Sequence, residues 1–246
     1  MPILFTKSGS NKIKFTKNGN NKFLLKKLIK DPYFNNVCLL LHMDGLSGST
    51  DFIDSSTNNF TLTAFGNAQI NTSIKKFGSG AAYFNGDYIE IPANATITST
   101  EDFTIECWVY PLTLTSDSGY TFIYGFKNES PNGNFSFGYT TGGFLFTAQS
   151  WLIVDNTANT EPLNLNQWNH ITLTRTNGTL RGFVNGKQCI SVSNNNNYPS
   201  GKVGAIGGDY GGNPYFNGYI DEFRITKGVA RYTSDFLVPT NPFPDL

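Results

Sequence analysis

The chain of 246 residues contains few of the residues that make cross-links or metal sites: two histidines, two methionines and three cysteines. Cys38, Cys107 and Cys189 are odd in number and widely spaced, so we expect buried free thiols and no disulfide framework. Two histidines with scattered cysteines also lack the spacing of a zinc site. No segment approaches the ~20 apolar residues of a membrane span, and the N-terminus lacks the apolar stretch of a signal peptide. We therefore expect synthesis in a cytoplasm without membrane insertion.

The residues that are abundant favour β-structure. The chain has 21 Phe, 12 Tyr and 25 Gly, together with many Thr and Asn. Aromatic and β-branched residues are typical of strands, whereas Gly and Asn are typical of turns that need positive φ. We therefore predict an all-β protein without long helices.

Charge is unevenly distributed although the formal net charge is zero. Residues 1–30 contain eight lysines and no acidic residue, so this segment carries +8 and the remainder carries −8. A basic segment joined to an acidic body suggests an attachment segment on a separate domain.

A short repeat opens the chain. Residues 3–12 and 13–22 each join an extended Phe-Thr-Lys to a glycine-centred turn, and a third, incomplete copy begins at Phe23. This pattern predicts a β-ribbon of about three antiparallel strands, a sheet that is marginal by itself. We expect partner contacts through Phe5, Lys7, Phe15, Lys17 and Phe23, either with other proteins of a particle or with copies of the chain. Solvated strands without a partner are the alternative.

Nucleic acid is not expected as the partner of this segment, because it has no arginine and no recognised binding motif. Residues 31–36 contain Pro32 and two asparagines and are interpreted as a linker. We therefore divide the chain into an N-terminal attachment arm, 1–36, and a body, 37–246.

The body reads as one strand after another. Strands are expected at 37–42, 60–64, 81–84, 88–91, 103–111, 120–126, 135–140, 143–148, 170–176, 179–184, 187–191 and 218–226. Asn177-Gly178 and Asn185-Gly186 predict hairpins, because a type I′ turn needs positive φ at both central residues. Many short strands with turn residues between them predict two packed antiparallel sheets.

Several segments of the body resemble one family. They are 39–45, 52–56, 76–86, 103–110, 167–175, 183–187 and 220–225, the last with the sequence Ile-Asp-Glu-Phe-Arg-Ile. In this order they resemble the laminin G-like branch of the concanavalin A-like lectin/glucanase superfamily, over about residues 37–240. The resemblance implies a jelly-roll sandwich, and the closing segment is most similar to domains on bacteriophage structural proteins and large bacterial surface proteins.

Catalysis is not expected. Glucanases of this superfamily need two carboxylates roughly 5 to 9 Å apart across a groove, and their Glu-x-Asp-x-x-Glu pattern does not occur here. Asp221 and Glu222 are adjacent, so strand alternation would send them to opposite faces. His42 and His170 have no nucleophile in a recognisable elbow and are interpreted as strand residues satisfied by their neighbours.

Structural calcium is the cofactor that we consider. If the first and last strands of the body pair, Asp44 lies close to Asp221, and Asp54 could add a further oxygen ligand. Two carboxylates held together repel each other, and a hard cation relieves that repulsion. The alternative is that Asp44 caps its turn and Asp221 accepts hydrogen bonds from backbone N–H groups.

Sugar binding would need aromatic residues on loops with polar neighbours. The candidates are Trp151, Asp209, Tyr210, Asn213 and Tyr215. By contrast, Trp108 and Trp168 are expected as core anchors, since burial of such rings stabilises strongly. Arg224 alternates with core residues, so its head should meet a carboxylate such as Glu106 or Glu222 on the opposite face.

These observations predict a non-enzymatic structural protein of a virion, as a bacteriophage head decoration or tail-fibre component. Its arm would dock on the particle and the sandwich would be displayed outward. The alternative is a carbohydrate-binding adhesin or receptor-binding module whose arm only oligomerises.

Overall fold

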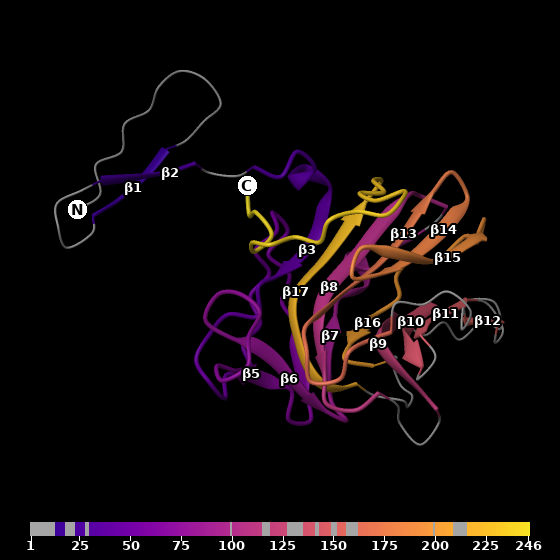
Figure 1. The fold of residues 1–246 in the computed structure, drawn as a ribbon, viewed down its shortest axis with the longest axis horizontal. Helices are drawn as coiled ribbons and strands as arrows, with labels where there is room; N and C mark the ends of the chain where they lie inside the picture. Colours follow the sequence, from indigo (N-terminus) through magenta and orange to yellow (C-terminus); the bar gives the residue numbers. More distant parts are fainter. Residues whose placement is uncertain are drawn as a thin grey trace.

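A computed structural model describes residues 13–17, 23–27, 30–98, 100–114, 119–126, 135–140, 143–148, 152–155, 162–198, 200–208 and 216–246. Figure 1 shows these residues as a sandwich of strands with a small ribbon at its N-terminal side. Helix is confined, in the described ranges, to two short 3-10 turns, Phe34–Asn36 and Ala93–Ala95. Neither could span a membrane.

Two antiparallel sheets form the sandwich. The seven-stranded sheet has the order β12-β11-β10-β9-β16-β7-β4. Its strands are β4 (Thr63–Phe65), β7 (Tyr88–Ile91), β9 (Tyr120–Phe126), β10 (Phe135–Thr140), β11 (Gly143–Ala148), β12 (Leu152–Asp155) and β16 (Gly204–Ile206).

The eight-stranded sheet has the order β15-β14-β13-β8-β17-β6-β5, and β3 also pairs with β17. Its strands are β3 (Val37–Leu41), β5 (Gln69–Asn71), β6 (Ala81–Asn85), β8 (Phe103–Pro111), β13 (Asn169–Thr176), β14 (Thr179–Val184), β15 (Lys187–Ser193) and β17 (Asn217–Lys227). The predicted all-β sandwich is therefore confirmed, as is the antiparallel pairing of β3 with β17.

Strand alternation on either side of a bulge in β17 places its core residues. In β17, Ile220, Phe223 and Ile225 face the other sheet and are fully buried. The Phe223 ring lies 5.7 Å from that of Tyr124 in β9, and the Tyr124 ring lies 5.9 Å from that of Phe135 in β10. Each such side chain stabilises the fold by about 1.5–3 kcal/mol relative to an exposed one.

Turn residues behave as the sequence predicts at both hairpins. Asn177 and Gly178 have φ of 48° and 70°, and Asn185 and Gly186 have φ of 49° and 78°. The three cysteines are buried and free, as predicted. Strands β5, β12 and β16 were not predicted, because three or four residues are too short for a clear alternating pattern.

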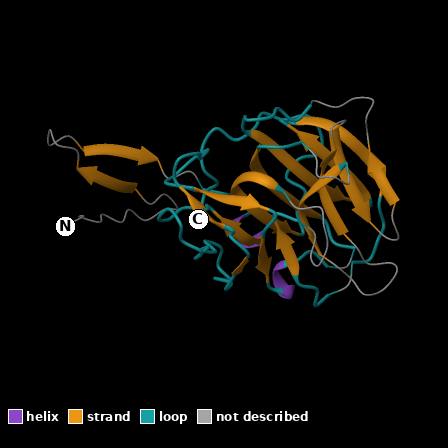
Figure 2. Cartoon of the chain, turned by 90° about the horizontal axis from the view of Figure 1, so that it is seen from below, coloured by secondary structure: helices purple, strands orange, loops and turns teal. Residues whose placement is uncertain are grey.

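The N-terminal ribbon consists, where the structure describes it, of β1 (Ile13–Lys17) and β2 (Phe23–Lys27), paired antiparallel as a separate two-stranded sheet. Figure 2 shows this ribbon apart from the two sheets of the sandwich. The predicted first strand of the repeat, with Phe5 and Lys7, lies outside the described residues.

The two tryptophans expected in the core differ. Trp108 in β8 is 3% exposed, so its burial is confirmed, but its ring lies on the face of the eight-stranded sheet that points away from the core, where Phe77 and His170 pack on it. Trp168, just before β13, is partly exposed, and its ring contacts Tyr110 at 5.6 Å. The expectation of a core role for Trp168 is therefore wrong, because its side chain lies on the same outer face but stays partly exposed.

Candidate functional site

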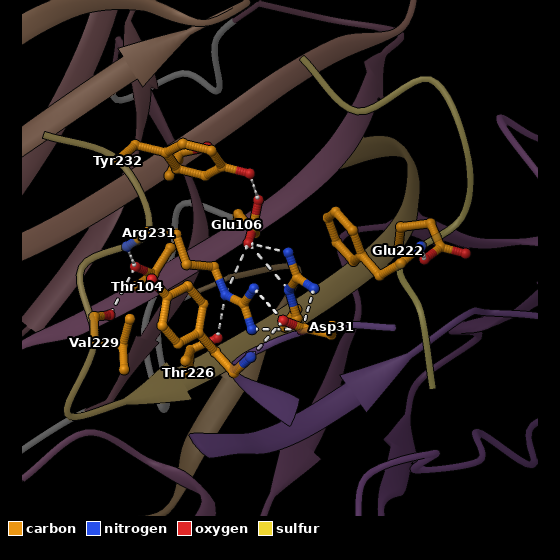
Figure 3. A network of polar contacts seen from close by, with 12 residues as sticks. Asp31, Thr104, Glu106, Glu222, Thr226, Val229, Arg231 and Tyr232 are labelled. Atoms are coloured by element: carbon orange, nitrogen blue, oxygen red, sulfur yellow. Dashed lines mark hydrogen bonds and ion pairs between the residues drawn. The ribbon is translucent and has the colours of Figure 1, made fainter. Parts of the chain in front are cut away.

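A buried cluster of charges lies on the outer face of the eight-stranded sheet, the face that points away from the core (Figure 3). Arg224 of β17 donates from Nε and Nη2 to Glu106 Oε1 in β8, at 3.0 and 2.6 Å. Its Nη1 donates to Asp31 Oδ2 at 3.0 Å. Arg231 donates to both oxygens of Asp31, at 2.9 and 2.7 Å. The predicted pairing of Arg224 with Glu106 is confirmed, and two arginines and two carboxylates balance each other.

Further donors complete the environment of Glu106. Tyr232 donates its hydroxyl to Glu106 Oε2 at 3.0 Å, and His170 Nε2 lies 3.4 Å from the same oxygen. Burial alone would raise the pKa of this fully buried carboxyl, but Arg224, His170 and Arg231 outweigh that effect and lower it to about 2. Glu106 is therefore held ionised as an internal counter-ion, not as an acid that titrates near neutral pH.

Asp31 belongs to the sandwich. It is 7% exposed, its N–H donates to the carbonyl oxygen of Leu246, and its carboxylate binds both arginines. Burial acts to raise the pKa of Asp31, yet Arg231 and Arg224 lower it below its ordinary value. The interpretation of Asp31 as a linker residue is therefore wrong, and the chain meets the sandwich at this residue. The division into an attachment arm and a body stays a prediction.

An open cavity of 270 Å³ lies beside the cluster, where the N-terminal segment meets the C-terminal one. It is lined by Lys30, Asp31, Arg224, Arg231 and the proline-rich residues 239–244. Arg224 also packs over the ring of Phe243 at 3.8 Å. The two arginines that line the cavity are already paired with Asp31 and Glu106, so these groups hold the N-terminal and C-terminal segments together and are not free to act on a substrate.

A β-bulge places Glu222 on the same face as this cluster. The register between β17 and β8 shifts between Asp221 and Arg224, and Glu222 has φ of 52°. Its carboxylate accepts a hydrogen bond from the N–H of Phe243 at 2.8 Å and lies 2.8 Å from His42 Nδ1. Burial opposes protonation of His42, but Glu222 raises its pKa overall. The prediction that Asp221 and Glu222 lie on opposite faces is wrong, because strand alternation fails at a bulge.

The three aspartates considered for calcium do not form one group. Asp54 accepts hydrogen bonds from the N–H groups of Leu40, Ser56 and Phe60 at 2.9–3.1 Å, beside β3. Within the described ranges, no group of three or more His, Cys, Asp and Glu residues has the arrangement of a metal site.

Asp44 and Asp221 instead meet the same loop. Asp44 accepts hydrogen bonds from the N–H and hydroxyl of Ser79 and from the N–H of Gly80. Asp221 accepts from the N–H groups of Lys76 and Phe77 at 2.8 and 3.0 Å. This is the alternative geometry considered above, in which both carboxylates bind backbone N–H groups. Calcium binding itself stays a prediction.

The environment of Asp221 is unusual for a carboxylate. Its side chain is fully buried, and its Oδ1 has no hydrogen-bond partner among the described residues. Burial raises the pKa of Asp221 to about 7, with a smaller contribution from the charge of Glu222, although the two backbone N–H groups act to lower it.

The residues predicted to bind sugars, Trp151, Asp209, Tyr210, Asn213 and Tyr215, lie outside the described residues. Of the residues predicted to bind a partner, Phe15 and Lys17 lie in β1 and Phe23 begins β2. Sequence reasoning missed Asp31 and Arg231 as members of the buried cluster. Neither stands in a strand, so no alternating pattern indicated its partner.

The fold and this cluster define an all-β sandwich whose buried carboxylates serve internal contacts. Residues 83–231 match the family described as the concanavalin A-like lectin/glucanases superfamily, so the chain belongs to that superfamily. A search of curated proteins gave no significant match.

Solved structures with the same fold include domain 4 of AbnA, an extracellular arabinanase of family GH43 from Geobacillus stearothermophilus, in complex with arabinotriose. The TM-score is 0.62 and the identity 25%, over 78% of this chain and 93% of that one. The receptor binding domain of botulinum neurotoxin D has a TM-score of 0.57 and 19% identity, over 79% of this chain and 50% of that one. The binding domain of Paraclostridial Mosquitocidal Protein 1 has a TM-score of 0.58 and 20% identity, over 81% of this chain and 50% of that one. This chain thus spans about half the length of the two toxin domains.

Proposed function

We propose that this protein is a non-enzymatic module that binds a glycan. The observation that carries the proposal is the similarity to the arabinanase domain in complex with arabinotriose, which this chain covers over 93% of its length at 25% identity. The likeness to receptor-binding domains of toxins agrees in fold.

The internal pairing of three carboxylates, Asp31, Glu106 and Glu222, supports binding without catalysis. Glu106 and Asp31 are neutralised by Arg224 and Arg231, and Glu222 is held by His42 and the N–H of Phe243. A glycosidase needs a carboxylic acid and a second carboxylate that both reach the substrate. Carboxylates held by internal donors stabilise the sandwich instead.

The test of this function is binding by the full chain. Isothermal titration with arabinotriose, cellohexaose and maltohexaose should give saturable binding at millimolar concentration or tighter, without release of reducing sugar. Cleavage of any of these probes would contradict the absence of catalysis. No saturable binding to any of them would contradict the proposed function.

A second proposal concerns where the module is held: as a structural protein of a virion, with a bacteriophage as the expected particle. The observation that favours it is the lysine-rich ribbon β1-β2, which pairs within itself as a sheet separate from the sandwich (Figure 2). Such a sheet needs a partner for stability. Other virion proteins or copies of the chain, in contact with residues such as Phe15, Lys17 and Phe23, would supply it.

The structure defines the deletion that tests this second proposal. Removal of residues 1–29 leaves Asp31 and its arginine partners in place. We expect this variant to fold and bind glycan like the full chain, but to lose self-association or attachment to particles. Normal assembly of the shortened chain would contradict an attachment role for the N-terminal segment.

A further inference from the structure

Four aromatic side chains form a row across neighbouring strands of the eight-stranded sheet. Tyr219 of β17 is directly opposite both Tyr83 of β6 and Tyr110 of β8 in the strand register. Ring centroids are 5.1 Å apart for Tyr83 and Tyr219, 5.9 Å for Tyr219 and Tyr110, and 5.6 Å for Tyr110 and Trp168. We call Tyr83, Tyr219, Tyr110 and Trp168 the aromatic row.

The row faces solvent. The strand neighbours Phe84, Val109 and Ile220 are fully buried in the core, so alternation places the row on the outer face. All four rings are partly exposed. The adjoining part of this face is covered, since Phe77 packs on Trp108 at 6.0 Å and Phe236 and Phe243 pack on His170 at 5.8 and 6.4 Å.

A polar atom without a partner lies on the same face. Asn217 precedes Tyr219 by two residues in β17, so its side chain leaves the strand on the side of the row. Its Oδ1 is buried and has no hydrogen-bond partner within the described part of the chain. A buried acceptor without a hydrogen bond destabilises the folded protein until a donor pairs with it. Its register partner Asn85 is exposed, so this end of the row is open to solvent.

The row consists of three tyrosines and one tryptophan and contains no Asp, Glu, Lys or Arg. Burial raises the pKa of Tyr219, and the neighbouring hydroxyls of Tyr83 and Tyr110 raise it further. Tyr219 therefore stays protonated near neutral pH, and each tyrosine of the row offers a hydroxyl group beside its ring. A row without charge favours an uncharged partner over an acidic or basic one.

We propose that the aromatic row binds a neutral oligosaccharide that lies across strands β6, β17 and β8 and reaches Trp168. A sugar ring presents C–H groups on its face and hydroxyls at its rim, so its face packs on an aromatic ring while its hydroxyls can bond with the tyrosine hydroxyls. A linear row of rings matches a linear chain of sugar units. This inference rests on the proposed glycan-binding function and adds a location that differs from the loops with Trp151 and Tyr210.

Alanine variants of the row test the location. We expect Tyr219→Ala and Trp168→Ala to weaken binding of arabinotriose, cellohexaose or maltohexaose by about tenfold or more in isothermal titration, since aromatic anchors dominate such contacts. Tyr219→Phe keeps the ring and should change affinity only about threefold or less, in line with loss of one hydroxyl contact. Trp168 precedes its strand, so its variant tests the row with little risk to the sheet.

The matched control comes from the other sheet. Phe65 and Tyr88 stack at 4.7 Å in β4 and β7 and are also partly exposed. Tyr88→Ala should leave affinity unchanged. Thermal melts of every variant, followed by circular dichroism, separate a loss of binding from a loss of folding.

Each other result overturns the inference. If row variants bind as well as the wild type while Trp151→Ala or Tyr210→Ala abolishes binding, glycan binding stands and the row is not its site. If sedimentation shows a dimer that Tyr219→Ala dissociates, a second copy covers the row. If row variants bind all three sugars like the wild type but lose attachment to particles, the row contacts a protein. If the wild type binds none of the three sugars, the proposed function fails as well.

Discussion

Substitution of Asp31 by alanine should destabilise the sandwich strongly. The Asp31 carboxylate is 1% exposed and faces Arg224 and Arg231, whose side chains are 4% and 8% exposed. Without it, two buried guanidinium groups share the single charge of Glu106 and leave one positive charge unbalanced. Removal of one partner from a buried ion pair typically costs about 3–5 kcal/mol.

That loss is a large share of the stability of a domain, about 5–15 kcal/mol. For a chain of this length it corresponds to a fall in melting temperature of about 6–20 °C. Two deletions, one that keeps Asp31 and one that removes it, test the same contact. Removal of residues 1–29 should leave the melting temperature of the sandwich unchanged, whereas removal of residues 1–36 should lower it as Asp31→Ala does.

The assay is thermal and urea denaturation followed by circular dichroism and tryptophan fluorescence. Lys187→Ala is the control, because Lys187 and Asp235 form an ion pair of 3.0 Å in which both side chains are more than half exposed. We expect this variant to melt like the wild type. An Asp31→Ala variant within about 1 kcal/mol of the wild type, the range of exposed pairs, would refute the reasoning.

Three other predictions concern the loop and the sheets. Asp221→Asn should stabilise the protein more at pH 8 than at pH 5. The pKa of the native carboxyl is raised to about 7, so below pH 7 this group holds a proton that the unfolded carboxyl has lost. The stability of the wild type therefore falls as pH rises to 7, whereas an amide does not titrate. Equal effects in urea titrations at the two pH values would contradict this. If calcium binds at Asp44 and Asp221, millimolar calcium should raise the melting temperature and Asp44→Asn should abolish the increase; an unchanged melt excludes the site. Gly138→Ala should lower the free energy of unfolding by about 1–3 kcal/mol or more in urea titration, because the new Cβ overlaps the carbonyl oxygen of Thr121. In the control Gly45→Ala the new Cβ would lie 3.4 Å from Ile70, so this variant should unfold like the wild type.

Local sequence determined most of the strands and their turns. A type I′ turn needs positive φ at both central residues, and Asn and Gly adopt it readily, so the hairpins at 177–178 and 185–186 could be predicted without knowledge of the rest of the chain. Alternation within β17 likewise placed the head of Arg224 on the outer face, where Glu106 is its partner.

Tertiary structure alone decided which distant groups meet. The burial of Asp31 depends on arginines about 200 residues away in the chain, and the position of Glu222 depends on a bulge that strand alternation cannot reveal. The aromatic row likewise exists because the sheet order places β6, β17 and β8 side by side. Backbone φ preference and alternation act over a few residues, whereas the pairing of strands is a property of the whole chain.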